Sequence, residues 1–469
     1  MQEAPELRRR RGQLRLVANC WNLLEGRREL YLPRGEREPE AAYRRRVEAA
    51  LPSGFFRDAL RTFAGMLSRE NWTALPAGLE LVLSDVDGRG TDLGAFLAAA
   101  DVLVLRDGGC LLLVLPPDHL WPSEGDRQQA LRRGDRLSLP RLQLVPRTDL
   151  LNWELPHSHG LPVQLTWREA IPGSEPVQAD AIGLWPEQPC PWLYRTFQLR
   201  ADGVALSTET LAADPQSASG WQVKQLEQRL YQGLKQLPGL WYSSDGAGFG
   251  EGELPHLGLA HQYLNQFRCQ SDYQELLSRC ALPVGVRTGV VGSVGQPPAS
   301  DPVVLGPNTV MDLPEGASFQ FAEVQARSLA EHRAWLQVLD AAMRRDALIP
   351  SSSGGVARTA TEISLAASQS YALLQSQAIQ KASLFSSLLQ HWCAITGEPL
   401  SPQAALQVSV NPLTPPVAPR PTVSEWLLLE EKGVVSREEL RQLLELATPV
   451  QVSQSVTSGA ELLPTADPP

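Results

Sequence analysis

Hydrophobic positions recur with two different periods along the chain, and the change of period divides it into regions. Between residues 39 and 70, apolar residues recur at helical spacing, and Pro52-Ser53-Gly54 breaks the pattern, so we expect one interrupted helix or two. Residues 140–245 instead alternate by two, as in "RLQLV" and "TFQLRADGVALST", where Asp202-Gly203 is typical of a hairpin turn. The two periods together predict an α+β fold.

Shorter patterns lie before and between these regions. Residues 1–30 are rich in Arg, and we expect them to be partly mobile. The stretch "LELVLS" predicts a short strand, followed by a turn at 85–90 and a short helix near 92–100. A hairpin is expected around Asp107-Gly108-Gly109.

From residue 255 onward the pattern becomes helical over long stretches. Residues 255–283 and 328–349 predict two helices, separated by a Gly/Pro/Val-rich β insertion at 284–325. A third helix is expected from Thr359 to Thr396, ended by Gly397, and at 1.5 Å per residue it is about 55 Å long. Residues 404–420 then predict a strand and a Pro-rich link, 421–447 a helical pair, and 448–469 a disordered tail.

Charge is distributed unevenly. The chain holds 42 Lys and Arg against 52 Asp and Glu, a net charge of −10. Residues 1–70 nevertheless carry 15 Arg against 10 acidic residues, so the remainder is strongly acidic. A protein that grips duplex DNA tightly needs many phosphate-neutralising cations. The composition therefore argues against a tight grip, but it is compatible with a passage through which DNA slides.

Neither a metal ion, a cofactor nor a membrane is expected as a partner. The six Cys are scattered without a CxxC pair, and "HSH" at 157–159 has no further His or Cys cluster near it in sequence. The Gly-rich "GAGFGEG" at 246–252 lacks the preceding strand and the spacing of a dinucleotide site. No apolar run reaches the roughly 18 residues that a membrane span needs.

The stretch "VLSDVDGRGTD" is the best candidate for catalysis. An apolar strand followed by Asp85 and Asp87 is similar to the haloacid-dehalogenase phosphatase motif, in which the first Asp is the nucleophile and the second an acid or base. That motif has Thr or Val two residues after the second Asp, where this chain has Arg89. The structural alternative, which we favour, is a turn in which Asp and Gly set the backbone and Thr91 or Asp92 caps the next helix.

The stretch "SSSGGVARTATE" (351–362) joins two predicted helices. Adjacent glycines, the lack of a following Lys and the preceding helix exclude a Walker loop. Thr359 and Glu362 form a capping box that begins the next helix. The first part is either a plain helix–helix connection or a loop presented to a ligand, and Arg358 supports the second because its planar donors suit phosphate.

No single motif carries chemistry, but the order of elements is distinctive. The chain resembles the portal proteins of tailed bacteriophages, the head-to-tail connectors, and is similar to a portal-like family catalogued as an uncharacterised conserved domain. The resemblance covers about residues 30–445. The matching stretches run in order: "YLPRGEREPEAAYRRRVEAA", "DVDGRGTDLGAF", "DLLNWEL", "LGLAHQYLNQFRCQSDYQELLSRCALPV" and "TATEISLAASQSYALLQSQA".

This resemblance implies the parts of a portal subunit. These are an N-terminal α/β wing (1–254), a stem helix (255–283), a clip (284–325), a second stem helix (326–350), a tunnel loop (351–358), a long wing helix (359–397), a strand with a Pro-rich link (398–420) and crown helices (421–447). The DNA-facing loop would consist of Ser351, Ser352, Ser353, Gly354, Gly355, Val356 and Arg358. Further candidate DNA contacts are Arg344, Arg345 and Lys381; for both arginines, pairing with neighbouring Asp or Glu is the alternative.

The resemblance also implies a function without a catalytic centre. Such proteins form a ring of identical subunits, normally twelve, at one capsid vertex of the virion, after assembly in the host cytoplasm. Double-stranded DNA passes through the ring during packaging and ejection. The implied partners are the terminase large subunit, a tail adaptor protein and the major capsid protein, with scaffold as a further candidate. Two alternatives stay open: a phosphatase-like hydrolase, and another oligomeric connector component of the virion.

Overall fold

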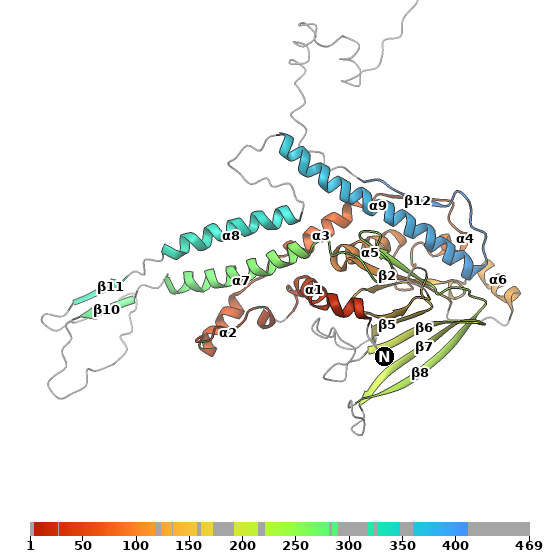
Figure 1. Cartoon of the computed structure of the whole chain (residues 1–469), viewed down its shortest axis with the longest axis horizontal. Helices are drawn as coiled ribbons and strands as arrows, with labels where there is room; N and C mark the ends of the chain where they lie inside the picture. Colours follow the sequence, from red (N-terminus) through yellow and green to blue (C-terminus); the bar gives the residue numbers. More distant parts are fainter. Residues whose placement is uncertain are drawn as a thin grey trace, which may run out of the picture. The chain divides into compact units, whose positions relative to one another are not determined.

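The computed structural model describes residues 4–26, 28–117, 123–133, 135–156, 161–171, 192–213, 221–280, 284–288, 318–322, 327–347 and 360–410. The chain divides into two compact units, residues 1–413 and 414–469, and all described residues lie in the first. This unit combines helices with antiparallel sheets, so the expected α+β class is confirmed (Figure 1). The expected crown helices, the tail and the Pro-rich part of the link lie outside the described residues.

The Arg-rich start of the chain forms a packed helix, α1 (Pro5–Asn22). Leu7, Leu14 and Val17 are buried on one side of this helix, because their spacing places them on a single face. The arginines surround that apolar stripe and do not prevent its burial. Residues 5–22 are therefore an ordered part of the fold in this structure, and the expected partial mobility of residues 1–30 stays a prediction.

The helical pattern at 39–70 is confirmed as two helices. α2 (Glu40–Ala49) and α3 (Phe55–Met66) are separated at Pro52-Ser53-Gly54. α3 buries Phe56, Leu60 and Phe63, which recur at helical spacing. A single 3₁₀ turn, η1 (Arg28–Leu30), precedes α2.

The segment between α3 and the sheets differs from the prediction in two places. Residues expected as a strand form a short helix, α4 (Ala77–Leu81), which begins after Pro76 and buries Leu79. The next helix, α5 (Leu93–Asp107), continues past residue 100 because Val104 and Leu105 pack into the core. Tertiary burial thus overrides the strand preference of "DVLVLRD".

Gly108 ends α5 instead of turning a hairpin. Its φ of +77° is in the left-handed region that glycine adopts without strain, and its N–H donates to the Val104 carbonyl at 2.9 Å. β2 (Gly109–Leu115) begins at the next residue. A side chain at Gly108 would also meet the backbone of Glu253, so the close approach of two segments requires glycine here.

The β-rich region expected at 140–245 is confirmed, and together with β2 its strands form two antiparallel sheets. β2 lies between β3 (Arg141–Pro146) and β9 (Gly239–Ser243) in the first. The second sheet has the order β4-β5-β6-β7-β8, so each strand pairs with its neighbour in sequence. Its hairpin at Asp202-Gly203 pairs Arg200 with Gly203, as predicted. The strands are β4 (Leu150–Glu154), β5 (Gln164–Ala170), β6 (Trp192–Arg200), β7 (Gly203–Ala213) and β8 (Trp221–Gln232).

The three long helices expected after residue 255 are confirmed. They are α7 (Leu257–Cys280), α8 (Arg327–Asp346) and α9 (Ala360–Thr396). Gly397, at a φ of +75°, follows α9 as its left-handed end residue. The remaining elements are β1 (Glu70–Thr73), α6 (Glu124–Arg132), η2 (Arg136–Ser138), β10 (Val284–Thr288), β11 (Ser318–Ala322) and β12 (Ala405–Val408).

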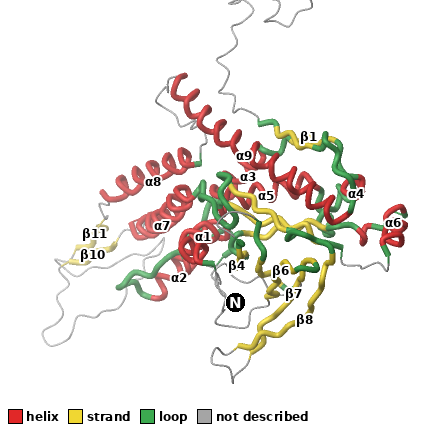
Figure 2. The backbone as a smooth tube through the Cα atoms, turned by 45° about the vertical axis from the view of Figure 1, so that its right-hand side comes forward, coloured by secondary structure: helices red, strands yellow, loops and turns green. Residues whose placement is uncertain are grey.

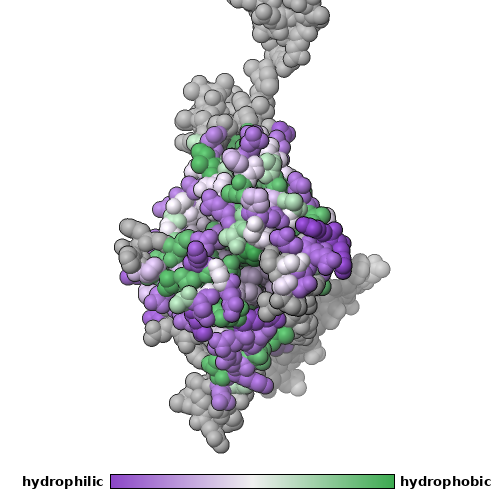
Figure 3. Space-filling view, turned by 90° about the vertical axis from the view of Figure 1, so that its right-hand side faces the viewer, coloured by the Kyte–Doolittle hydropathy of each residue, from purple (hydrophilic) through white to green (hydrophobic). Residues whose placement is uncertain are grey.

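Two apolar clusters hold the unit together. One joins α1, α3 and α7 to the second sheet, and it includes Phe56, Phe267 and Trp167. The other joins α9 to α5 and to β2, and it includes Phe385 and Trp392. On the face shown in Figure 3, hydrophilic residues surround smaller groups of hydrophobic ones.

Candidate functional site

α7 and α8 lie side by side and are joined at one end through the strand pair β10–β11 (Figures 1 and 2). The chain leaves α7 into β10 and returns through β11 into α8, so the two helices run in opposite directions. Leu339 and Met343 of α8 are buried, as the predicted apolar stripe requires. The two helices and a β insertion between them were expected, and the structure adds that β10 and β11 pair antiparallel. Their roles as stem and clip stay predictions.

Arg344 and Arg345 lie in the last turn of α8. The Arg344 Nε donates to Asp340 Oδ2 at 2.9 Å, one helical turn away, and Arg345 pairs with Asp346 at 3.4 Å. The alternative of pairing with neighbouring acids is therefore what the structure shows. The Arg345 side chain is 76% exposed. Exposed pairs of this kind contribute little free energy, so a DNA contact by either arginine stays a prediction.

The expected tunnel loop lies outside the described residues. α8 ends at Asp346 and α9 begins at Ala360, so the two helices bracket the loop in sequence. The loop residues concerned are Ser351, Ser352, Ser353, Gly354, Gly355, Val356 and Arg358. Their contact with DNA stays a prediction.

The third candidate cation, Lys381, does not face a channel. Its side chain is 0% exposed, and its Nζ contacts the carboxylates of Glu70 and Asp101. The same nitrogen donates to the Leu67 carbonyl at 3.3 Å. The prediction of a DNA contact at Lys381 is therefore wrong, because a buried ammonium that is already paired cannot reach phosphate. A lysine within the apolar stripe of α9, in a chain with few lysines, was the signal that we missed.

Asp101 is also hydrogen-bonded by the Tyr242 hydroxyl, which donates to Asp101 Oδ1 at 2.8 Å. Burial raises the pKa of Asp101, and the nearby Lys381 ammonium opposes that shift. Burial likewise raises the pKa of Glu70 against the effect of Lys381. We call these four side chains, Lys381, Glu70, Asp101 and Tyr242, the buried lysine cluster.

The two aspartates of the phosphatase-like stretch serve as acceptors within their own turn. Asp85 Oδ1 accepts from the Gly90 N–H at 2.7 Å. Asp87 Oδ1 accepts from the Arg89 and Thr91 N–H groups, and Oδ2 accepts from the Thr91 hydroxyl at 2.7 Å. Asp92 caps α5 by accepting from Ala95 N–H at 2.9 Å. This arrangement is the turn and cap that we favoured from sequence.

The electrostatics of Asp87 do not suit a general acid. Desolvation raises its pKa, but the hydrogen bonds from Thr91 and Arg89 outweigh that effect, and the pKa is lowered. A catalytic acid near neutral pH needs a raised pKa. A cavity of about 410 Å³ borders the turn and is lined in part by Arg89, Arg141 and Glu169. Within the described part of the chain, no group of three or more His, Cys, Asp or Glu is placed to hold a metal ion.

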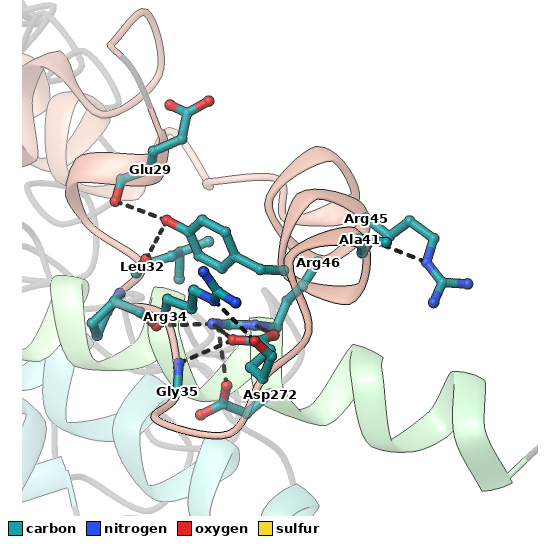
Figure 4. A network of polar contacts seen from close by, with 11 residues as sticks. Glu29, Leu32, Arg34, Gly35, Ala41, Arg45, Arg46 and Asp272 are labelled. Atoms are coloured by element: carbon teal, nitrogen blue, oxygen red, sulfur yellow. Dashed lines mark hydrogen bonds and ion pairs between the residues drawn. The ribbon is translucent and has the colours of Figure 1, made fainter.

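A polar network fixes α2 and the preceding loop against α7 (Figure 4). The Arg46 Nε and Nη2 donate to the two oxygens of Glu38 at 2.8 and 2.9 Å, and Nη2 also donates to the Pro33 carbonyl at 2.8 Å. The Arg46 Nη1 lies 3.6 Å from Asp272 of α7. A cavity of about 680 Å³ beside the network extends to His332 of α8. The network thereby ties α2 and the loop before it to α7.

The helices of the described residues include none that is long and apolar enough to cross a membrane. A family described as a domain of unknown function, DUF4055, matches residues 255–393, from the start of α7 into the last turn of α9. No curated protein matches the chain.

Several solved structures are similar to this chain at low identity. A chain from the "virion of native gene transfer agent (GTA) particle" is 14% identical, with 93% of this chain and 99% of that chain covered and a TM-score of 0.40. A chain from the "neck of empty GTA particle computed with C6 symmetry" is 13% identical, with 90% and 99% covered and a TM-score of 0.40. A chain from the "neck of native GTA particle computed with C12 symmetry" is 15% identical, with 90% and 99% covered and a TM-score of 0.38. TM-scores of this size do not by themselves establish a common fold.

Proposed function

We propose that this chain is a phage portal protein that forms a ring at one vertex of a capsid. The ring would be the channel for double-stranded DNA during packaging and ejection. The observation that carries the proposal is the succession α7, β10–β11, α8 and α9: two paired helices joined through a strand pair, followed by a short connection and a helix of 37 residues. This succession matches the order of stem, clip, stem and long wing helix that the sequence resemblance implies.

The physical requirements of a ring agree with this arrangement. A head-to-tail interface between identical subunits closes into a ring when its rotation allows. Paired helices and a long helix supply extended sides for such contacts. Half-exposed apolar residues lie on α8, including Trp335 and Val338, beyond the residues that pack inside the unit. We propose a ring of about twelve subunits, as the resemblance implies.

The net charge of the chain fits a channel through which DNA moves better than a site that binds DNA tightly. DNA that moves through a channel must not adhere to its wall, and every Lys or Arg contact with phosphate adds sequence-independent attraction. The net charge of −10 keeps such attraction low. We propose that Arg358, in the loop 351–358, is the main cationic contact, with Arg344 and Arg345 at the preceding helix end as secondary ones. Lys381 is not part of this set, because it is buried and paired with Glu70 and Asp101.

The partners follow from the proposed parts of the subunit. The clip, residues 284–325, would meet the terminase large subunit during packaging and the tail adaptor afterwards. The wing would contact the major capsid protein. ATP hydrolysis would belong to the separate motor, and no catalytic centre is proposed for this chain. Another oligomeric connector component of the virion is the remaining alternative, whereas the use of Asp85 and Asp87 in their own turn argues against a phosphatase.

The proposal is tested by locating the chain in assembled particles. A small globular protein fused to the chain before assembly, located by electron microscopy of intact particles, should mark a single vertex, inside the capsid shell. A fused protein found at many vertices, or only on the tail below the capsid, would contradict the portal assignment. The second of these results would favour the alternative connector component.

A further inference from the structure

The buried lysine cluster brings together four elements that are far apart in sequence. Lys381 comes from α9, Asp101 from α5, Tyr242 from β9, and Glu70 from the first position of β1. Side-chain exposure is 0% for Lys381 and Asp101 and 3% for Glu70. Tyr242 is 2% exposed. Water is therefore excluded from all four polar groups.

The charges in this cluster do not balance when every group has its ordinary ionisation state. One ammonium faces two carboxylates, which leaves one negative charge in a buried site. An uncompensated buried charge is strongly unfavourable, and such groups take up or lose a proton instead. Two carboxylates that share one site then titrate as a pair.

The hydrogen bonds indicate which carboxylate carries the proton. Asp101 is contacted by both the Lys381 ammonium and the Tyr242 hydroxyl, and these donors stabilise its charged form. Glu70 is contacted by the Lys381 ammonium, but among the described residues it has no second donor comparable to the Tyr242 hydroxyl. Among the residues that the structure describes, the outer charged or titratable neighbours are Asp92, which faces Glu70, and Cys110, which faces Tyr242; neither adds a positive charge.

Glu70 also lies at a structurally sensitive point. β1 pairs with β12, and Glu70 stands opposite Val408 in that ladder. The Ser409 N–H donates to the Arg69 carbonyl at 2.9 Å, one residue further on. β12 is the last strand of the described residues, which end at 410, and the second compact unit begins at residue 414. The ladder therefore anchors the point from which the second unit departs.

We infer that Glu70 is held protonated around neutral pH, that this proton keeps the buried lysine cluster neutral, and that its loss at alkaline pH loosens the β1–β12 anchor. The protonation state of the cluster thus controls how firmly β12, near the end of the first unit, is held against β1. The inference is independent of the portal function, since it concerns the folding and local opening of one chain.

The sign of the effect follows from linkage. A carboxyl group whose pKa is raised by folding keeps its proton in the folded chain at pH values where the unfolded chain has lost it. Stability is then fully present below the unfolded value near 4.3 and falls as pH rises, until the folded group has also ionised. Over that window, one retained proton increases the unfolding equilibrium constant by roughly tenfold per pH unit.

The experiment compares the full-length wild-type chain with Glu70→Gln, a neutral isostere of the protonated acid. Glu80→Gln, on the exposed side of α4, is the matched control. Unfolding by urea is followed from pH 5 to pH 9. We expect the wild type and Glu80→Gln to lose stability in parallel, whereas Glu70→Gln lacks the component attributed to this proton and exceeds the wild type at the alkaline end. Parallel curves for all three proteins would overturn the inference.

Two further measurements keep the test decisive if unfolding is not reversible. Infrared difference spectra of wild type minus Glu70→Gln at pH 7 should contain the C=O band of a protonated carboxylic acid; its absence would overturn the inference. Hydrogen exchange of residues 405–408 should lose protection between pH 7 and pH 9 in the wild type and not in Glu70→Gln. Equal pH dependence in both proteins would contradict the proposed anchor.

Discussion

Replacement of Arg46 by Met should destabilise the chain far more than the same change at Arg44, two positions earlier on the same helix. Arg46 is 9% exposed and makes two charged hydrogen bonds to Glu38 and one to the Pro33 carbonyl. Arg44 pairs with Glu40 at 3.1 Å, but their side chains are 73% and 52% exposed. The two arginines thus compare a buried pair with an exposed one in the same helix.

The magnitudes follow from burial. A hydrogen bond to a charged group contributes about 1.5–3 kcal/mol, and breaking a fully buried pair costs about 3–5 kcal/mol. The Glu38 side chain keeps 12% exposure and the Gly35 N–H as a donor, which limits the cost of leaving it without Arg46. We therefore expect Arg46→Met to lower the free energy of unfolding by about 2–3 kcal/mol. Arg44→Met should lower it by about 0.3–0.5 kcal/mol.

Equilibrium urea unfolding of the unassembled chain is the assay, with Glu38→Gln and the Arg46→Met/Glu38→Gln double variant completing a double-mutant cycle. The double variant should lose less than the sum of the two single variants, because neither then leaves a buried charge unpaired. If Arg46→Met and Arg44→Met agree within about 0.5 kcal/mol, the network of Figure 4 does not stabilise the fold as we argue.

Three further predictions test other parts of the account. Phe385→Ala, on the fully buried face of α9, should lower the free energy of unfolding in urea by about 3–5 kcal/mol. The control Ser386→Ala, exposed on the same helix, should lower it by less than about 0.5 kcal/mol. Equal losses of stability would refute the placement of α9. Arg358→Glu should reduce DNA packaging or retention while rings still assemble, with Arg358→Lys as the charge-preserving control, and unchanged packaging would defeat the assignment of this loop. Burial lowers the pKa of His256 to about 4, so as pH falls below about 6.5 the unfolded chain protonates this imidazole before the folded chain does. The free energy of unfolding should therefore drop by up to about 3 kcal/mol between pH 6.5 and pH 4. In a series of unfolding curves over this pH range, His256→Leu should lack that part of the loss.

Elements with long, regular periodicity were predictable from the sequence, because the spacing of their apolar residues identifies the face that packs. α7, α8 and α9 are long helices whose apolar residues recur at helical spacing, and the strands of the second sheet alternate, two of them joined by the turn at Asp202-Gly203. Short elements were not predictable. "DVLVLRD" has the local composition of a strand, yet Val104 and Leu105 are helical because partners distant in sequence bury them.

The polar sites likewise divide into those that were predictable from local sequence and those that were not. The turn at Asp85 and Asp87 was predictable because the hydrogen bonds that these two carboxylates accept all come from residues within the same short stretch. Lys381 was misread because its partner Asp101 is 280 positions away. Its place in the apolar stripe of α9 indicates burial, but nothing local identifies the carboxylates that pair with it. Long-range charge pairing therefore limits what sequence alone reveals about which cations remain available to DNA.

Electron microscopy of the purified chain, with class averages viewed along the particle axis, tests the central claim most directly. The account predicts closed rings with a central channel and roughly twelvefold symmetry, in which the helix pair α7–α8 lines the channel wall. Monomers or dimers that persist when the chain is co-expressed with its capsid protein would contradict the assignment as a portal ring.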